Sequence, residues 1–406
     1  MSGGSYPKKR WMVLGIAWGS FFAIGMAWYV MPTLQPRLRE LYGLSASQFR
    51  LCLTAPFLVA GFLAIPGGMI ADRFGIRRAA AAGIAIAGVG YLVRSMTGGF
   101  GLLLGAMLLV GVGVGLLMPN LPKLVNLWFP PDETGLATGI YNTAIMGGFA
   151  TGLVIAPSLP GWATGNVVLA GLVLALAVAF FAVVRDAPPG HDVPSTPFVE
   201  GVQRAVASRN TWIAALAVFA GFGGMVALQG QLPVGLLKVY GIPPGVGGQI
   251  ASMLTYSGIL GSLTIPPIAT RIDRRRMVLL SVSLAFGIIE FAVWLSGDPT
   301  LLFAGTTVAG YLAGGALPIL MEVPAWLPQL EESPVQQRHV GGASGVMTSL
   351  MNLGGFAGLP FIVGPIINAR GYTVGFLVAM IVFAFQGIFG FFLSFPESAS
   401  GEGRHP

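Results

Sequence analysis

Long apolar stretches recur along the chain and are separated by short polar or Pro- and Gly-rich breaks. Each stretch is roughly 20 residues long, which is the length that an α-helix needs to cross the ~30 Å hydrocarbon core of a bilayer. Backbone groups in lipid must be paired internally, so these stretches predict helices. The twelve stretches are residues 11–31, 51–70, 79–92, 102–118, 136–155, 162–184, 212–232, 250–268, 277–295, 301–320, 342–366 and 374–393. The pattern therefore predicts an all-α membrane protein with 12 transmembrane helices.

One long polar segment divides the twelve stretches into six and six. Residues 185–210 are rich in proline and charged side chains, which is typical of a linker. We therefore expect an N-terminal six-helix half at 1–184, a cytoplasmic linker at 185–210, a C-terminal six-helix half at 211–396 and a cytoplasmic tail at 397–406.

The two halves repeat each other's sequence features. Asp72, after the second stretch, is matched 201 residues later by Asp273, after the eighth. The pair Gly148 and Gly152 in the fifth stretch is matched 206 residues later by a glycine pair in the eleventh. Glycines four residues apart share a helix face, where they permit either sliding or tight static packing. Duplicated, pseudo-symmetric halves are typical of transporters with the solute site between the halves.

The composition supports a lipid-facing surface. Hydrophobic residues make up 54% of the chain and charged residues only 9%, against about 25% in soluble domains. The net charge of +7 does not indicate nucleic-acid binding, because the basic residues lie at the ends of the stretches. A single cysteine, Cys52, excludes a disulfide framework, and the three histidines lie in loops or in the tail. We expect no metal and no cofactor, and as partners a small-molecule solute and the lipid bilayer.

Basic residues are distributed unevenly between the two sides of the predicted bundle. With the N-terminus in the cytoplasm, 16 of the 22 Lys and Arg residues fall on the cytoplasmic side and 6 on the outer side. This bias predicts a multi-pass protein of the cell (inner) membrane with both termini cytoplasmic. The six on the outer side are Arg37, Arg39, Arg50, Arg94, Lys238 and Arg370.

The loop between the second and third stretches carries the motif GMIADRFGIRR at residues 68–78. This motif resembles the signature loop of the major facilitator superfamily in position and length. The segments 128–131, 317–322, 342–345 and 352–356 are similar to the branch of cyanate permeases and nitrate/nitrite porters. The resemblance implies the superfamily fold, with two six-helix halves that alternate access to a central site.

The resemblance also implies an inner gate at this loop. Asp72 would meet the partially positive N-terminus of the eleventh helix, which begins near Gly342. Arg77 has an equally good interpretation as a cytoplasmic anchor. Near the inner ends of spans four and ten, Lys123 and Glu322 form either an inner-gate ion pair or ordinary solvated helix ends. The gating candidates are Gly68, Asp72, Arg73, Gly75, Arg77, Lys123, Asp273, Arg274 and Glu322.

In the superfamily, spans 1, 4, 7 and 10 line the cavity, with spans 2, 5, 8 and 11 beside them, so polar groups on these spans are the substrate-binding candidates. For any one of them, an interhelical hydrogen bond is an equally good interpretation. The candidates are Trp18, Ser20, Arg50, Asn142, Gln229, Gln231, Tyr256, Tyr311, Thr348 and Asn352.

Charged groups inside the stretches are rare. Nitrate porters carry arginines inside spans two and eight, and this sequence has neither; Arg50 stands at the outer mouth of span two. Glu290 is the only carboxylate well inside a span and is the candidate for proton coupling. Its alternative is a structural role, paired with Arg94 or with a neighbouring polar group.

These features together predict a secondary active or facilitative transporter that moves a small polar organic solute or weak anion by alternating access. One alternative is multidrug or organic-cation efflux, which would call for an acidic residue on spans 1, 4 or 7. Another is a non-transporting membrane receptor on the same fold. We expect no enzyme, since no catalytic constellation is visible, and we expect the monomer to be functional.

Overall fold

The structure is a computed structural model, and it describes residues 7–96, 98–188, 198–330 and 333–395. The predicted tail at 397–406, His191 and His405 lie outside the described residues. The helices are α1 Arg10–Tyr42, α2 Ala46–Phe74, α3 Ile76–Ser95, α4 Phe100–Leu117, α5 Leu121–Trp128, α6 Pro131–Ile155, α7 Trp162–Val183, α8 Phe198–Val206, α9 Arg209–Tyr240, α10 Pro244–Arg271, α11 Arg275–Ser296, α12 Pro299–Met321, α13 Val323–Trp326, α14 Val340–Ala357, α15 Gly364–Arg370 and α16 Tyr372–Phe391.

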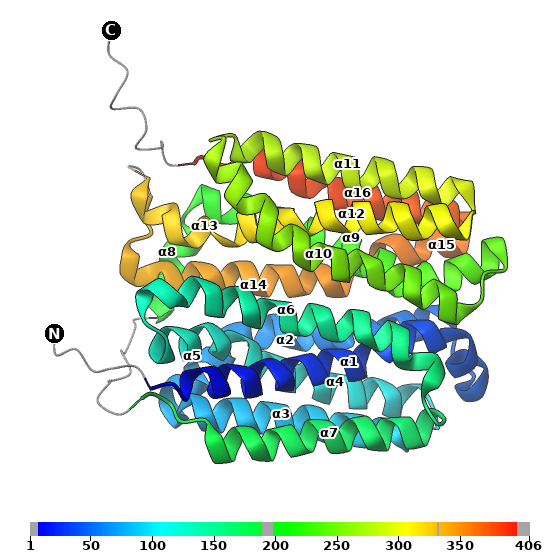
Figure 1. Cartoon of the computed structure of the whole chain (residues 1–406), viewed down its shortest axis with the longest axis horizontal. Helices are drawn as coiled ribbons and strands as arrows, with labels where there is room; N and C mark the ends of the chain where they lie inside the picture. Colours follow the sequence, from blue (N-terminus) through cyan, green and yellow to red (C-terminus); the bar gives the residue numbers. More distant parts are fainter. Residues whose placement is uncertain (1–6, 97, 189–197, 331–332, 396–406) are drawn as a thin grey trace, which may run out of the picture.

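Two bundles of long helices lie side by side, one made of α1–α7 and the other of α9–α16 (Figure 1). Eleven helical spans are long and apolar enough to cross a membrane. The long helix outside that set is α10, whose 28 residues span about 42 Å. It packs among the others, and its several Ser and Thr residues lower its hydropathy. The eleven spans and α10 make twelve, so the predicted all-α fold with 12 transmembrane helices is confirmed.

Several helices continue beyond the stretches that hydropathy predicts. The first helix runs on to Tyr42 and the seventh span to Tyr240, whereas their apolar stretches end at residues 31 and 232. Helix α2 begins at Ala46, where Ser45 accepts a hydrogen bond from the backbone N–H of Gln48 in a capping box. Hydropathy marks only the part of a helix that lies in lipid, so caps rather than apolarity set these ends.

The repeated glycine pairs pack the fifth span of each half against the first span of that half. A Cβ at Gly148 would collide with the backbone of Phe22 in α1, and one at Gly354 would collide with Phe219 in α9. The two contacts are equivalent in the two halves, as the internal repeat predicts. Since each lies within one half, they favour the static-packing alternative over sliding between halves.

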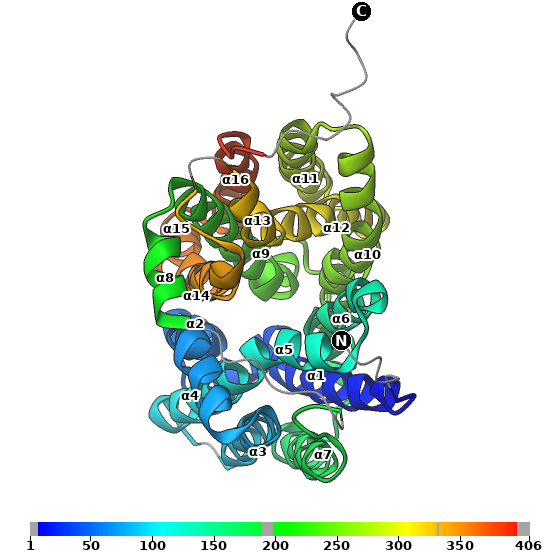
Figure 2. The same ribbon diagram turned by 90° about the vertical axis from the view of Figure 1, so that its left-hand side faces the viewer.

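The two halves meet along two seams and at a central aromatic contact. Helix α2 packs on α14 along one seam, and α6 packs on α10 along the other (Figure 2). Between the seams, Phe57 of α2 meets Phe222 of α9 edge to face, with ring centroids 5.3 Å apart. Phe149 of α6 and Trp28 of α1 extend this aromatic cluster on the N-terminal side. The core of the molecule is therefore continuous across the two halves at mid-depth.

Candidate functional site

Arg50 connects the two halves at one end of the bundle. This end lies away from the first and last described residues, and we call it the outer end, as the charge bias predicts. From the second turn of α2, the Arg50 guanidinium donates to Gln231 Oε1 at 3.3 Å, to the Gly364 carbonyl at 3.0 Å and to Asn368 Oδ1 at 2.9 Å. Gln231 in turn donates to Gln35 Oε1 of α1 at 2.9 Å. We call these five residues the outer cluster.

The positive charge of the outer cluster is that of Arg50, and the side chains and carbonyls that bond to it are neutral. Arg50 is 1% exposed and forms no ion pair among the described residues. Its ionisable neighbours are the phenol of Tyr372 and a second cation, Arg39. Hydrogen bonds to a charged group contribute about 1.5–3 kcal/mol each, and leaving a buried charge unsatisfied costs at least as much. The cluster therefore favours contact between the halves at this end.

Backbone contacts bring the halves equally close at the outer end. Gly248 of α10 lies against the Leu153 carbonyl of α6, and the hydroxyl of Thr33 donates to that same carbonyl at 3.0 Å. One turn inward from Arg50, Leu53 packs on Gly230 of α9. A Cβ at Gly248 would collide with the backbone of the opposite half, and one at Gly230 would press on the Leu53 side chain. The outer end is thus closed by close packing as well as by hydrogen bonds.

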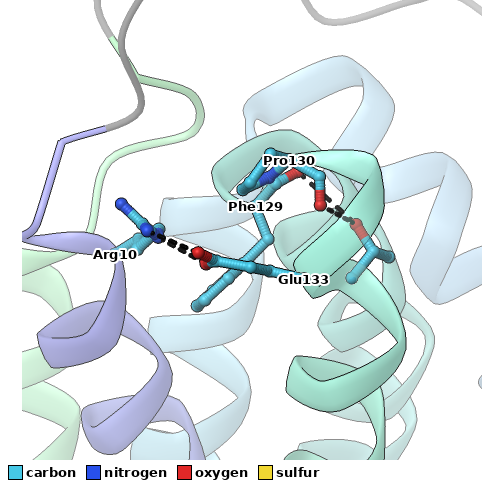
Figure 3. A network of polar contacts seen from close by, with 5 residues as sticks. Arg10, Phe129, Pro130 and Glu133 are labelled. Carbon is cyan, nitrogen blue, oxygen red and sulfur yellow. Dashed lines mark hydrogen bonds and ion pairs between the residues drawn. The ribbon is translucent and has the colours of Figure 1, made fainter.

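The ion pairs at the opposite, inner end do not join the two halves. Arg10 at the start of α1 forms a two-pronged pair with Glu133 in the first turn of α6, with N–O distances of 2.8 and 2.9 Å (Figure 3). Glu200 of α8 lies 3.3 Å from His339 and 3.4 Å from Arg338, ahead of α14. Helix α5 packs on α1 and α6 of its own half, and α13 packs on α9 and α14 of its own half. Among the described residues, no ion pair joins the halves here.

The signature loop is tied to its own half. Asp72 pairs with Lys123 of α5 at 2.5 Å, and Lys123 also donates to the Gly68 carbonyl at 3.0 Å. The prediction that Asp72 meets the N-terminus of the eleventh span is therefore wrong for this structure. That terminus instead packs against α8, where Gly201 lies on Gly342. The predicted Lys123–Glu322 pair is likewise not formed, since Glu322 is exposed and its charged neighbour is Arg275.

The remaining loop candidates anchor the turn between α2 and α3. Gly75 has φ +91°, which a side chain rarely adopts. The backbone N–H of Arg77 donates to Asp186 Oδ1 at 2.7 Å, and its guanidinium donates to the Phe181 carbonyl at 2.7 Å. These contacts fit the anchor interpretation of Arg77. The Arg73 guanidinium lies over the Phe74 ring. In the second-half copy, Asp273 has φ +50° in the turn before Arg274, the N-cap of α11.

Four predicted substrate residues lie on α1, α6 and α14, whose helices meet between the halves, on the inner side of the central aromatic cluster. Phe149 belongs to the central aromatic cluster, so its helix face points between the halves, and Asn142, two turns away on that face, is exposed. Trp18 of α1 is half-buried and donates to Thr143 at 3.0 Å. Across the seam, Asn352 Nδ2 lies 3.8 Å from Met118 Sδ, and Nδ2 donates to the Thr348 carbonyl at 2.9 Å.

The other predicted substrate residues form hydrogen bonds within or between helices, and the bond of Tyr256 reaches Thr151 of α6 in the other half. The hydroxyls of Tyr256 and Tyr311 share hydrogen bonds with threonines of neighbouring helices, each at 2.8 Å. Ser20 donates to the Ile16 carbonyl of its own helix at 2.8 Å, and Gln229 donates to Thr255 of α10. These contacts match the alternative of interhelical or intrahelical hydrogen bonding, and only Arg50 and Gln231 join the outer cluster.

Glu290 lies fully within the C-terminal half, between α11 and α12. Its Oε1 accepts a hydrogen bond from Thr306 at 3.3 Å, and its buried Oε2 has no hydrogen-bond partner among the described residues. The suggested pairing with Arg94 is wrong, because Arg94 is buried in the other half and donates to Asn166 at 2.7 Å and to the Ala27 carbonyl at 2.7 Å. The role of Glu290 in proton coupling stays a prediction.

Sequence reasoning missed three members of the outer cluster. Gln35 carried a usable signal, because it is an amide between two prolines, Pro32 and Pro36, in the outer part of the first span. Asn368 and the Gly364 carbonyl carried none, since they lie more than 300 positions from Arg50. Beside Gly364, span eleven contains a short π-helix at 358–363, a feature often found at functional sites.

Comparisons of the sequence with known proteins agree on one family. The sequence profile described as Major Facilitator Superfamily matches residues 16–359. The chain is 30% identical to the cyanate transport protein CynX of Escherichia coli over 296 residues, which are 71% of this chain and 74% of that protein. It is 26% identical to the probable nitrate/nitrite transporter NarK2 of Mycobacterium tuberculosis over 368 residues, 87% and 88% of the two chains.

Solved structures support the same fold. A bacterial homolog of the human lysosomal transporter Spinster, crystallised in an inward-facing and unoccupied conformation, superimposes with a TM-score of 0.75 at 18% identity. The match covers 96% of this chain and 97% of that one. The two sequence relatives confirm the resemblance to the branch of cyanate and nitrate/nitrite transporters. The chain belongs to the Major Facilitator Superfamily and is a membrane transporter.

Proposed function

We propose that this transporter carries small polar anions across the membrane by alternating access. One observation carries the choice of anion: among the described residues, the charged side chain that bonds across the two halves is a cation, Arg50, and it has no acidic partner. The relatives support the same class of solute, since one transports cyanate by its name and another nitrate or nitrite.

The solute would bind in the space between the halves, below the central aromatic cluster. The predicted substrate residues there are neutral hydrogen-bonding groups: Trp18, Asn142, Thr348 and Asn352. Amide and indole N–H groups can donate to an anion without a mid-membrane cation. We take the structure as the state in which this space is closed from the outer end and reachable from the inner end.

Cation efflux is less well supported by the charges. The described helices α4, α5 and α9 contain no Asp or Glu, and α1 contains only Glu40, near its outer end. A hydrophobic cation in the central space would therefore lack a carboxylate to pair with, whereas burial of an unpaired charge is costly. We propose further that both termini are cytoplasmic in the cell membrane, that the halves 1–184 and 211–396 move as bodies, and that the monomer suffices.

Uptake into proteoliposomes tests the anion class. The purified protein would be reconstituted with nitrate, nitrite or cyanate outside, with tetraphenylphosphonium as the cationic comparison. We expect saturable uptake of at least one anion, competition among anions and no uptake of the cation. Saturable uptake of the cation without any anion would contradict the proposal. Protein-free liposomes are the control for leakage.

A further inference from the structure

The hydrogen bonds from the Arg50 guanidinium to Gln231, Gly364 and Asn368 all cross from one half to the other. The arginine belongs to the N-terminal half, and its three acceptors, Gln231, Gly364 and Asn368, belong to the C-terminal half. Opening of the outer end therefore removes all three acceptors in a single movement. The guanidinium would then stand at the outer mouth with its N–H groups free to bond a ligand that arrives from outside.

We infer that Arg50 is an anion-operated latch: with the outer end closed it is held by neutral oxygens, and an external anion takes their place and stabilises the open end. The inference rests on the proposed function, because it assumes an anionic solute. It assigns to Arg50 the role of a gate that recognises the solute on entry, above the central space, and not that of a mid-membrane binding residue.

The chemistry of the cluster favours this exchange. A guanidinium offers parallel N–H groups that fit a planar oxyanion at two points, and such charge-assisted bonds are stronger than bonds to amides or carbonyls. The second cation beside Arg50, Arg39, adds to the attraction for an anion. The closed cluster offers no free place to an anion, since Arg50 is 1% exposed. An anion at this point thus binds the open state alone.

Binding to one state sets the direction of the effect. A ligand shifts an equilibrium by its difference in affinity for the two states, and here that difference is nearly complete. External anions should therefore increase access to the outer seam. A suitable reporter is Leu53, which is buried one turn inward from Arg50 and packs on Gly230 of the other half.

The test measures labelling of Leu53→Cys, in a Cys52→Ser background, by a membrane-impermeant maleimide added to the outer side. Nitrate, nitrite and formate are the anion probes, and gluconate at equal ionic strength is the reference. With Arg50 present, we expect at least one probe to raise the labelling rate about fivefold or more. With Arg50→Gln, labelling should be faster at rest and should no longer respond to the probes.

Two further variants keep the test decisive. Arg370→Gln removes an exposed cation at the end of α15, the helix of Asn368, and should leave the response unchanged. Arg50→Lys retains the positive charge but lacks the parallel N–H groups of the guanidinium, so the half-maximal probe concentration should rise about three- to tenfold. This shift remains measurable if Arg50→Gln does not fold. A full response in Arg50→Gln, no shift in Arg50→Lys, or no response to any probe in the parent would overturn the latch. The separate uptake assay decides the anion class, so the two failures are distinguishable.

Discussion

The two ends of the helix bundle use polar side chains in opposite ways. At the outer end, the hydrogen bonds of Arg50 and Gln231 run between the halves, and all are buried except the one to the exposed Asn368. At the inner end, the pairs Arg10–Glu133 and Asp72–Lys123 run within the N-terminal half and are partly exposed. These inner ion pairs thus stabilise the N-terminal half, whereas the hydrogen bonds of the outer cluster hold the two halves together.

The difference in burial makes the two ends unequal in energy. A partly exposed ion pair contributes about 0–1 kcal/mol, because water screens it and two long side chains must be ordered. A hydrogen bond from a buried guanidinium contributes about 1.5–3 kcal/mol, and Arg50 makes three of them. Among the polar contacts, the outer cluster therefore stabilises the state with the outer end closed more than the inner ion pairs do.

The largest effect is expected from a covalent bridge across the outer end. Asn368 Nδ2 lies 3.4 Å from Ser47 Oγ, so a short thiol-specific cross-linker should join Ser47→Cys on α2 to Asn368→Cys on α15 in a Cys52→Ser background. Because opening requires these helices to separate, the bridge should reduce uptake by at least 90%. Cleavage of the cross-linker should restore uptake.

The matched bridge lies at the inner end. Arg10→Cys and Glu133→Cys join α1 to α6 within one half, so their cross-link should leave at least half of the uptake. If the inner bridge inhibits as strongly as the outer one, or the outer bridge has no effect, the contrast between the ends is wrong.

The next largest effect is a difference in outer-end opening between substitutions of two glutamines in α9. Gln231 bonds to Arg50 and Gln35 of the other half, whereas Gln229 bonds to Thr255 within its own half. Loss of one charge-assisted bond costs about 1.4 kcal/mol or more, or a factor of ten in the gating equilibrium. Gln231→Leu should therefore raise external labelling of Leu53→Cys about tenfold. The control, Gln229→Leu, should raise it less than twofold, and equal responses would contradict the assignment.

A smaller effect is expected from the inner ion pair. Asp72 and Lys123 are both partly exposed and belong to one half, so Asp72→Asn should lower the unfolding free energy by about 1 kcal/mol or less. Thermal unfolding in detergent would measure the loss, and inside-out vesicles would show unchanged labelling of an inner-facing cysteine. A marked increase in that labelling would mean that the pair closes the inner end.

The smallest effect on anion exchange is expected for Glu290→Gln. Glutamine keeps the oxygen that accepts a hydrogen bond from Thr306, and the site lies within one half. The rate of anion exchange should therefore stay within about twofold of that of the parent protein. If Glu290 couples transport to protons, which is one of the two interpretations of its sequence position, accumulation driven by a proton gradient should be lost. Accumulation that survives would exclude that role, and Glu322→Gln at the exposed inner end is the control.

The sequence predicted the architecture well because membrane thickness fixes the length of each apolar stretch. It predicted helix ends poorly, since Tyr42 and Tyr240 close helices that continue beyond the lipid. Arg50 and Gln231 were both named, but their contact joins positions 181 residues apart and depends on how the halves are tilted. The Asp72 prediction was wrong for a related reason, because its partner depends on which end is closed.

The most direct test of the account is the side from which Asn142 can be reached. Asn142 is exposed on the helix face that points between the halves, toward the inner end. In a Cys52→Ser background, Asn142→Cys should react with an impermeant maleimide in inside-out vesicles and remain at least tenfold less reactive in right-side-out vesicles. Faster labelling from the outer side than from the inner side would contradict the closed outer end on which the account depends.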